Sequence, residues 1–236
     1  MEKQISPKEI FETPFSRAYW RAAAREFQDT RVLIFAALMI AIRVALKSMS
    51  IPIAANLRIN IAFFVNAYGA MVFGPVVALA AAAVSDTLGC LLFPTGTYFF
   101  PFIFVEMAGS LIFALFLYRT KITALKVTLS RFSIDFFVNI VLNTPIMWLY
   151  YRMVMGKNYV LFDGLRIVKN LVLFPIESVL LILFLRAVIP ATKHLGFLHS
   201  EVEDLRFTKK LVAFLIVMTL LGAAAVSAYA YYRAHA

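Results

Sequence analysis

The chain has 236 residues, of which 62% are hydrophobic and only 15% are charged, and its mean hydropathy is +0.84. This balance excludes an ordinary soluble globular domain and leaves no room within these residues for a catalytic domain beside one helical bundle. The net charge of +10 is spread over membrane-flanking segments without a nucleic-acid recognition motif, so we expect contact with anionic membrane lipid and no nucleic-acid partner.

Seven apolar stretches follow a polar tail, residues 1–31, which we expect to be partly helical. Because a membrane helix needs about 20 apolar residues, we predict helices over residues 32–49, 59–73, 75–93, 98–118, 132–153, 165–189 and 211–232. Glycine and proline breakers such as Gly74-Pro75 separate them. The predicted fold is therefore an all-α integral membrane protein: a six-helix domain over 32–190, a charged linker over 191–210 and an additional helix within 211–236.

The basic residues indicate the orientation of this bundle. Lys and Arg in short loops are retained on the cytoplasmic side, and they concentrate before residue 32, in the loop over 119–131 and in the linker over 191–210. These three segments share one face if the first helix enters from the cytoplasm. We predict a multi-pass cell-membrane protein with a cytoplasmic N-terminus and with loops 50–58, 94–98 and 155–164 outside.

Polar side chains inside the predicted helices mark the candidate site, because such groups are costly at membrane depth and are usually functional. They are Arg43, Asp86, Glu106, Asp135, Asn139, Asn143, Arg166, Lys169, Asn170 and Glu177. Two readings of Arg43 stay open: a structural ion pair with Asp86 or Glu106, or contact with a ligand. Asp135 and Arg166 lie near helix ends, where extension toward the membrane interface is the simpler reading.

The amides of Asn139 and Asn143 lie four residues apart, on one helix face. They can hydrogen-bond to a neighbouring helix, but the same face continues toward the outer end through Trp148, which favours ligand contact. Lys169 and Asn170, just below an outer loop, suit an anionic, hydrogen-bonding solute.

Small residues recur every four positions at Ala37, Ala41 and Ala45, which makes a flat strip on one side of the first helix. Close packing within the bundle and docking of another protein both explain such a strip. Spacing alone favours internal packing.

The sequence lacks the motifs of ATP hydrolysis and of zinc-dependent proteolysis. There is no phosphate-binding G-x-x-x-x-G-K-[ST] loop and no H-E-x-x-H pair, and the single Cys90 lies in an apolar stretch where it serves as a small packing residue. We expect no metal site, no cofactor and no enzymatic activity. No duplicated half-sequence is evident, which disfavours a stand-alone permease. That permease, an intramembrane enzyme and a structural membrane protein remain the alternatives.

Several segments together resemble a known family. They are the alanine strip, Leu57-Arg58-Ile59, Phe73-Gly74-Pro75-Val76, Ser85-Asp86-Thr87-Leu88-Gly89, Leu92 to Phe99 in an outer loop, Leu142-Asn143-Thr144 and Lys169-Asn170-Leu171. In these segments the chain resembles the substrate-binding S components of energy-coupling factor (ECF) vitamin transporters, most closely the folate-type members.

The resemblance implies a six-helix bundle that captures a vitamin at its outer side and docks, through the alanine strip, on a transmembrane coupling subunit driven by two ABC-type ATPases. A flat pterin ring favours aromatic faces and paired donors and acceptors, and glutamate carboxylates favour cations near the mouth. The substrate-binding residues expected on this basis are Arg58, Asp86, Tyr98, Phe99, Glu106, Asn139, Asn143, Trp148, Arg166 and Lys169.

Overall fold

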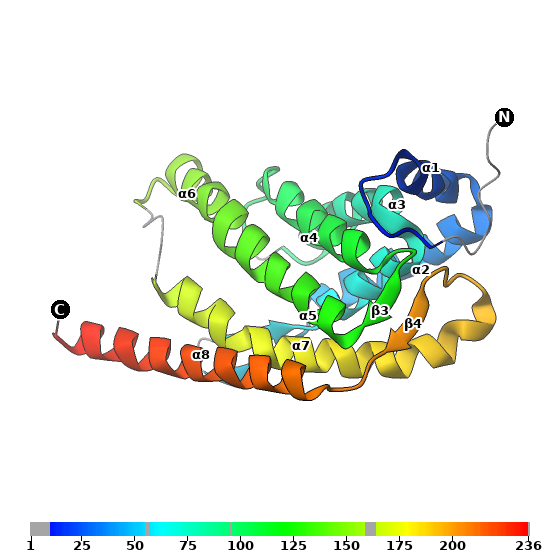
Figure 1. Ribbon diagram of the computed structural model, residues 1–236. Coiled ribbons are helices and arrows are strands. Elements are labelled where there is room, and N and C mark those ends of the chain that lie inside the picture. Colours follow the sequence, from blue (N-terminus) through cyan, green and yellow to red (C-terminus); the bar gives the residue numbers. More distant parts are fainter. Residues whose placement is uncertain (1–9, 55–56, 95, 159–163, 236) are drawn as a thin grey trace.

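The structure, a computed structural model, describes residues 10–54, 57–94, 96–158 and 164–235. Helices dominate it, and the longer ones pack side by side as one bundle (Figure 1). Four helical stretches in this described part are long and apolar enough to cross a membrane: Ala62–Leu92, Ala124–Met153, Arg166–Leu195 and Lys209–Tyr229. A shorter apolar helix, α4, spans Phe102–Leu117. The predicted all-α membrane bundle is confirmed.

Helix α2 (Thr30–Lys47), which corresponds to the first predicted helix, starts where the Asp29 carboxylate accepts a hydrogen bond from the Arg31 backbone N–H at 2.8 Å. The next element, α3 (Ala62–Leu92), is interrupted at Gly74, whose φ of 73° and ψ of 178° are not helical, and Pro75 follows. Asn66 before this break and Asp86 after it both contact the last two turns of α2. Twenty residues of continuous helix would separate them by about 30 Å, so the two halves run in opposite directions.

The turn at Gly74 confirms the predicted boundary between residues 73 and 75. Its positive φ favours glycine, and a Cβ there would lie 2.8 Å from the ring of Tyr118 at the end of α4. The first and second halves of α3 thus account for two of the predicted membrane helices.

The predicted helix over 132–153 begins earlier, at Ala124. It comprises α5 (Ala124–Ser133), a π-helical segment η2 (Ile134–Leu142) and α6 (Asn143–Met153). The Thr123 hydroxyl caps α5 by accepting a hydrogen bond from the Lys126 backbone N–H at 3.2 Å. Assigning Lys126 and Arg131 to a loop was therefore wrong, because this cap starts the helix on the N-terminal side of both.

Short strands occur at both ends of the bundle. Strands β1 (Ser50–Ala54) and β2 (Leu57–Asn60) pair antiparallel where the sequence predicted a loop over 50–58. The predicted start of the next helix at residue 59 was wrong, because β2 runs to Asn60 and α3 begins at Ala62. At the opposite end β3 (Lys121–Thr123) pairs parallel with β4 (Glu201–Asp204), with Ile122 opposite Val202. This second pair ties the segment after α4 to the linker that follows α7.

The N-terminal tail is packed against the bundle by α1 (Arg17–Arg25) and the 3-10 turn η1 (Glu26–Gln28). The buried Tyr19 hydroxyl donates a hydrogen bond to the Ala114 carbonyl of α4 at 3.0 Å, and burial raises the pKa of this phenol. The Tyr118 hydroxyl donates to Glu26 at 2.8 Å, and Arg119 lies 3.3 Å from the same carboxylate. The tail is therefore held by buried polar contacts.

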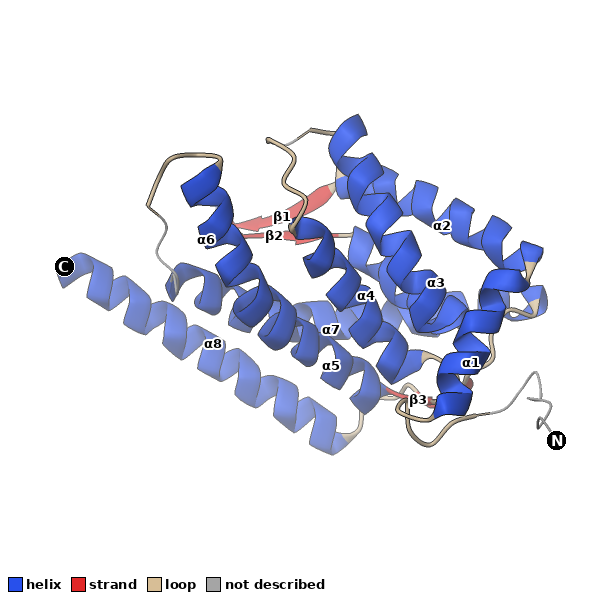
Figure 2. Ribbon diagram, turned by 90° about the horizontal axis from the view of Figure 1, so that it is seen from above, coloured by secondary structure: helices blue, strands red, loops and turns tan. Residues whose placement is uncertain are grey.

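Helix α7 (Gly164–Thr192), the 3-10 turn η3 (Lys193–Leu195) and α8 (Lys209–His235) complete the chain. Gly222 of α8 is buried against Val172 of α7, and the rings of Phe174 and Phe214 meet edge to face, 6.0 Å apart. Figures 1 and 2 place α8 beside α7, on the flank opposite α2.

Candidate functional site

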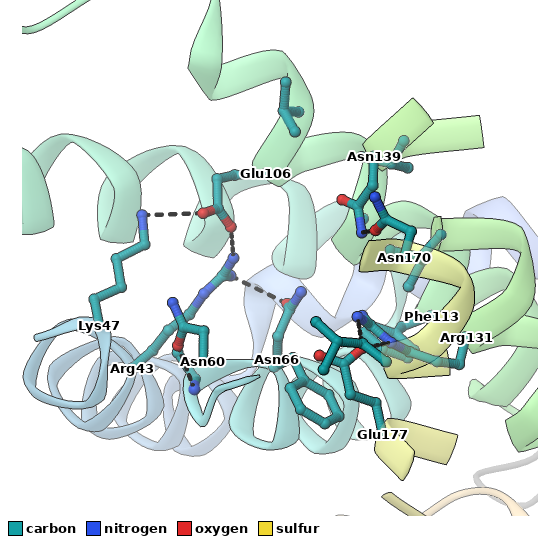
Figure 3. Close-up of a pocket in the computed structure, with 17 residues that line it drawn as sticks. Arg43, Lys47, Asn60, Asn66, Glu106, Phe113, Arg131, Asn139, Asn170 and Glu177 are labelled. Atoms are coloured by element: carbon teal, nitrogen blue, oxygen red, sulfur yellow. Dashed lines mark hydrogen bonds and ion pairs between the residues drawn. The ribbon is translucent and has the colours of Figure 1, made fainter. Parts of the chain in front are cut away.

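A two-part cavity lies among helices α2 to α7 and η2, and Figure 3 shows the residues that line its inner part. The inner compartment has a volume of about 320 Å³ and the outer compartment about 570 Å³. Lys47, Asn60, Val105 and Glu106 line both compartments, so the two meet at these side chains. Both volumes lie within the roughly 300–1,000 Å³ typical of small-molecule sites.

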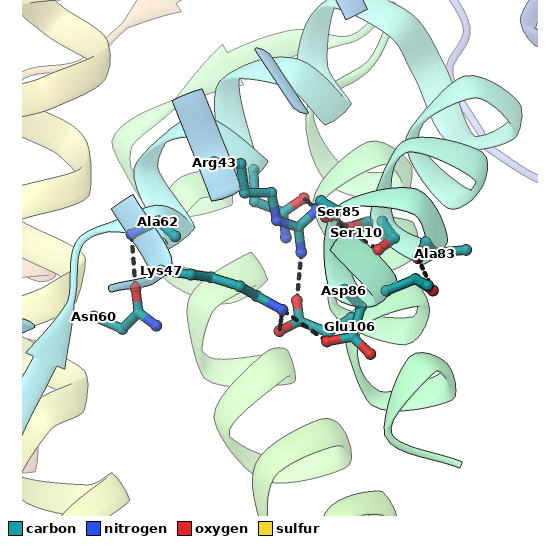
Figure 4. Close-up of polar contacts among 12 residues, drawn as sticks. Arg43, Lys47, Asn60, Ala62, Ala83, Ser85, Asp86, Glu106 and Ser110 are labelled. Carbon is teal, nitrogen blue, oxygen red and sulfur yellow. Dashed lines mark hydrogen bonds and ion pairs between the residues drawn. The ribbon is translucent and has the colours of Figure 1, made fainter. Parts of the chain in front are cut away.

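A network of charged side chains occupies the junction (Figure 4). Arg43 pairs with Glu106, and the Lys47 ammonium lies 2.7 Å from Asp86 and 3.1 Å from Glu106. Arg43 also donates to the Asn66 amide oxygen at 3.1 Å. Each carboxylate thus has a cationic partner, as burial of charge requires. Of the two pairings proposed for Arg43, the one with Glu106 is confirmed, while Asp86 pairs with Lys47.

Amides and a second charged network line the inner compartment. The Asn139 amide donates to Asp135 at 2.9 Å and to the Asn170 amide oxygen at 3.1 Å. Arg131 pairs with Glu177 and lies 3.1 Å from Asp135. Asn139 and Asp135 both belong to η2, and π-helical segments occur frequently at functional sites because their wider turn redirects side chains.

The outer compartment is more aromatic. The ring of Tyr150 lies 5.5 Å from that of Phe99 and 5.6 Å from that of Phe102, and Tyr98 is 43% exposed. Asn143 also lines this compartment, and its buried amide oxygen has no hydrogen-bond partner among the described residues. An unpaired buried acceptor costs about 1–3 kcal/mol, so a ligand donor would relieve this cost.

Most of the predicted binding residues lie on this cavity. Asp86, Tyr98, Phe99, Glu106, Asn139 and Asn143 line one compartment or both. Trp148, Arg166 and Lys169 are absent from both linings as the described residues define them; the Trp148 ring instead faces the Arg152 guanidinium at 5.2 Å. Arg58 lies in β2, opposite Pro52, and its side chain is outside the described part of the structure. A role in binding stays a prediction for all ten.

The sequence reading missed several lining residues, namely Lys47, Asn60, Asn66, Arg131 and Tyr150. The spacing of Arg43 and Lys47, four apart on one face of a helix, was the signal for Lys47. Arg131 was missed because it was assigned to a basic loop and used only to predict the orientation of the chain in the membrane. Asn60 and Tyr150 had no comparable signal.

The alanine strip is exposed along its whole length. Ala37, Ala41 and Ala45 lie on the outer face of α2, whereas Arg43 and Val44 point into the bundle. Internal packing, the reading that spacing alone favoured, therefore does not explain the strip.

No group of three or more His, Cys, Asp and Glu side chains within the described ranges has the arrangement of a metal site. The ion pairs above instead give each of these carboxylates a Lys or Arg partner. The cavity chemistry is that of recognition by hydrogen bonds, charge and aromatic surface.

Known proteins share this architecture. Residues 27–172 match the family model described as "ECF-type riboflavin transporter, S component". Folate transporter FolT of Clostridium novyi is 33% identical over 157 residues, covering 65% of this chain and 87% of the relative. FolT of Leuconostoc mesenteroides is 27% identical over 153 residues, covering 63% and 81%. A solved structure titled "Crystal structure of FolT bound with folic acid" aligns with a TM-score of 0.54 and 26% identity, covering 64% of this chain and 88% of that one. Because the family model spans more than half of its residues, the chain belongs to the S components of ECF-type transporters.

Proposed function

We propose that this S component captures folate or a related pterin-like compound at the outer face of the cell membrane and delivers it inward by docking on an ECF coupling subunit. The cavity supports this proposal: it combines paired amides, charged side chains and aromatic rings in two adjoining compartments. The two FolT relatives and the FolT structure with folic acid favour folate as the ligand.

A pterin ring presents adjacent donors and acceptors on a flat edge. Asn139 and Asn170 already pair with each other in the inner compartment, so each can exchange that bond for one to the ring. The outer compartment offers Tyr98, Phe99 and Tyr150 for aromatic contact, and Lys47, which lines both compartments, offers a cation for a carboxylate. We therefore propose that the ligand spans the junction at Lys47 and Glu106.

Delivery involves the remaining parts of the chain. In the proposed arrangement residues 32–190 form the substrate-binding domain, 191–210 the linker and 211–236 an added helix, with the N-terminal tail in the cytoplasm. The exposed alanine strip docks on the coupling subunit, which two ABC-type ATPases drive. Its position on the flank opposite α8 supports this, because the added helix leaves the strip uncovered (Figure 2).

Equilibrium binding to the detergent-purified single chain tests the ligand. Folate is titrated by calorimetry or by quenching of tryptophan fluorescence, with riboflavin, thiamine and biotin in parallel. We expect folate to bind in the nanomolar range and far more tightly than thiamine or biotin. Riboflavin is the second candidate because the matching family model carries its name; tighter binding of riboflavin than folate would replace the proposed substrate, and binding of none of the four would overturn it.

A further inference from the structure

A third cavity, of about 700 Å³, lies at the other end of α7, remote from the candidate site. The C-terminal part of α7, the segment before β4 and β4 itself surround it, and this end of the bundle also carries α1 and β3 (Figure 1). Its lining consists of Ile10, Arg186, Ile189, Pro190, Lys193, Leu198, His199, Ser200, Glu201, Val202 and Leu205.

The charge of this cavity is mainly positive. Arg186 and Lys193 are both exposed to it, and neither takes part in an ion pair among the described residues. Glu201 is the one carboxylate in the described lining. Glu26, whose carboxylate lies 3.5 Å from His199, does not line the cavity. Two cations without an acidic partner therefore face one acid on the cavity rim.

Much of the remaining lining is apolar, and its side chains range from buried to exposed. Ile189 and Leu205 are buried, 5% and 7% exposed, and Leu198 and Val202 lie closer to the surface. Arg186 belongs to α7 and Lys193 opens the turn η3 that follows it, and both line the cavity. A ligand that fits must carry negative charge at one end and hydrocarbon at the other.

The position of the cavity selects among such ligands. It lies where α7 leaves its apolar stretch, beside the basic linker. The ends of membrane helices are where phospholipid headgroups meet a membrane protein. Basic pockets between membrane helices at this level bind anionic headgroups. We propose that this cavity is a binding site for one anionic diacyl phospholipid, with its phosphate between Arg186 and Lys193 and its glycerol and upper acyl carbons against Ile189, Leu198 and Leu205.

Native mass spectrometry of the full chain in mild detergent tests the site directly. Dioleoyl phosphatidylglycerol and dioleoyl phosphatidylcholine are each titrated into wild type, into the double variant Arg186→Gln/Lys193→Gln, and into the control Lys209→Gln/Lys210→Gln. The control removes two exposed cations at the start of α8 that do not line the cavity. We expect one tightly retained phosphatidylglycerol in wild type and in the control, and about thirtyfold weaker retention in the double variant, at roughly 1 kcal/mol for each cation lost.

Equal loss in the control, or unchanged retention in the double variant, would show that the basic surface attracts lipid without a specific site and would overturn the proposal. An excess of inorganic phosphate serves as a competitor: if it displaces the lipid completely, the cavity takes a free anion and not a phospholipid. Folate affinity, measured on the same variants, should remain unchanged. The lipid site thus stands or fails separately from the proposed substrate, and intact folate binding also shows that the variants are folded.

Discussion

Polar side chains in the cavity differ in whether their hydrogen-bonding atoms already have partners in the protein. Arg43, Lys47, Asp86 and Glu106 satisfy one another, so a ligand entering the junction must offer better partners than those already present. Asn143 differs, because its buried amide oxygen has no partner within the described residues. Ligand binding gains most where the empty protein leaves a polar atom unsatisfied.

The first prediction concerns this amide. Replacing Asn143 with alanine should weaken folate binding by about 1–3 kcal/mol, because a ligand donor would lose its buried acceptor. Calorimetry on the purified variant measures the change. Asn158→Ala is the matched control, since Asn158 is exposed and lies outside both compartments. Equal affinities for the two variants would remove Asn143 from the site.

At the scale of elements, the helices were largely predictable and the irregular segments were not. Hydropathy and the Gly74-Pro75 pair placed the membrane helices, because length and backbone breakers act locally. The β1–β2 hairpin and the π-helical η2 were missed, because hydropathy signals neither the pairing of two short strands nor a widened helical turn. The same limit applies to the site, where intramembrane polarity marked Glu106 and Asn139 but could not show that Lys47 joins the two compartments.

The exposed alanine strip leads to the second prediction. Ala41→Trp should leave folate affinity unchanged and abolish uptake by the assembled transporter, because a bulky side chain prevents close approach of another helix. Uptake of labelled folate by cells and binding by the purified chain are measured together. Ala223→Trp on α8 is the control: this alanine is also exposed but lies on the opposite flank. Normal uptake by the Ala41→Trp protein would exclude docking through the strip.

The contact between α7 and α8 leads to the third prediction. A Cβ on Gly222 would lie 3.3 Å from the Val172 side chain and 3.4 Å from the Leu171 carbonyl oxygen, directly beside Asn170 of the cavity wall. Gly222→Leu should therefore push the helices apart, lower stability by about 1–3 kcal/mol and weaken folate binding. Thermal unfolding in detergent and calorimetry measure the two effects, with exposed Ala224→Leu as the control. A stable Gly222→Leu variant with wild-type affinity would show that α8 does not support this wall.

At the scale of the whole molecule, the two ends of the bundle differ in chemistry. The end that carries α1, β3 and β4 (Figure 1) holds basic segments and the proposed lipid site, whereas Tyr98 and Phe99, in the loop before α4, line the candidate substrate cavity. The positive-inside rule predicts that the basic end lies in the cytoplasm. The orientation of the chain therefore determines the side from which the substrate enters. If the basic end is inside, the substrate reaches the aromatic compartment from outside.

The lone cysteine allows both to be tested in one experiment, which is the fourth prediction. Cys90 lines the outer compartment and is partly exposed. A membrane-impermeant maleimide added to intact cells should label it, and bound folate should slow that labelling by covering the thiol. In a Cys90→Ser background, a cysteine placed at Lys209 should react only after the membrane is permeabilised, because Lys209 belongs to the basic end. Labelling of that second cysteine in intact cells would show that the topology is the opposite of the one proposed. Labelling of Cys90 at the same rate with and without saturating folate would show that the outer compartment is not part of the binding site.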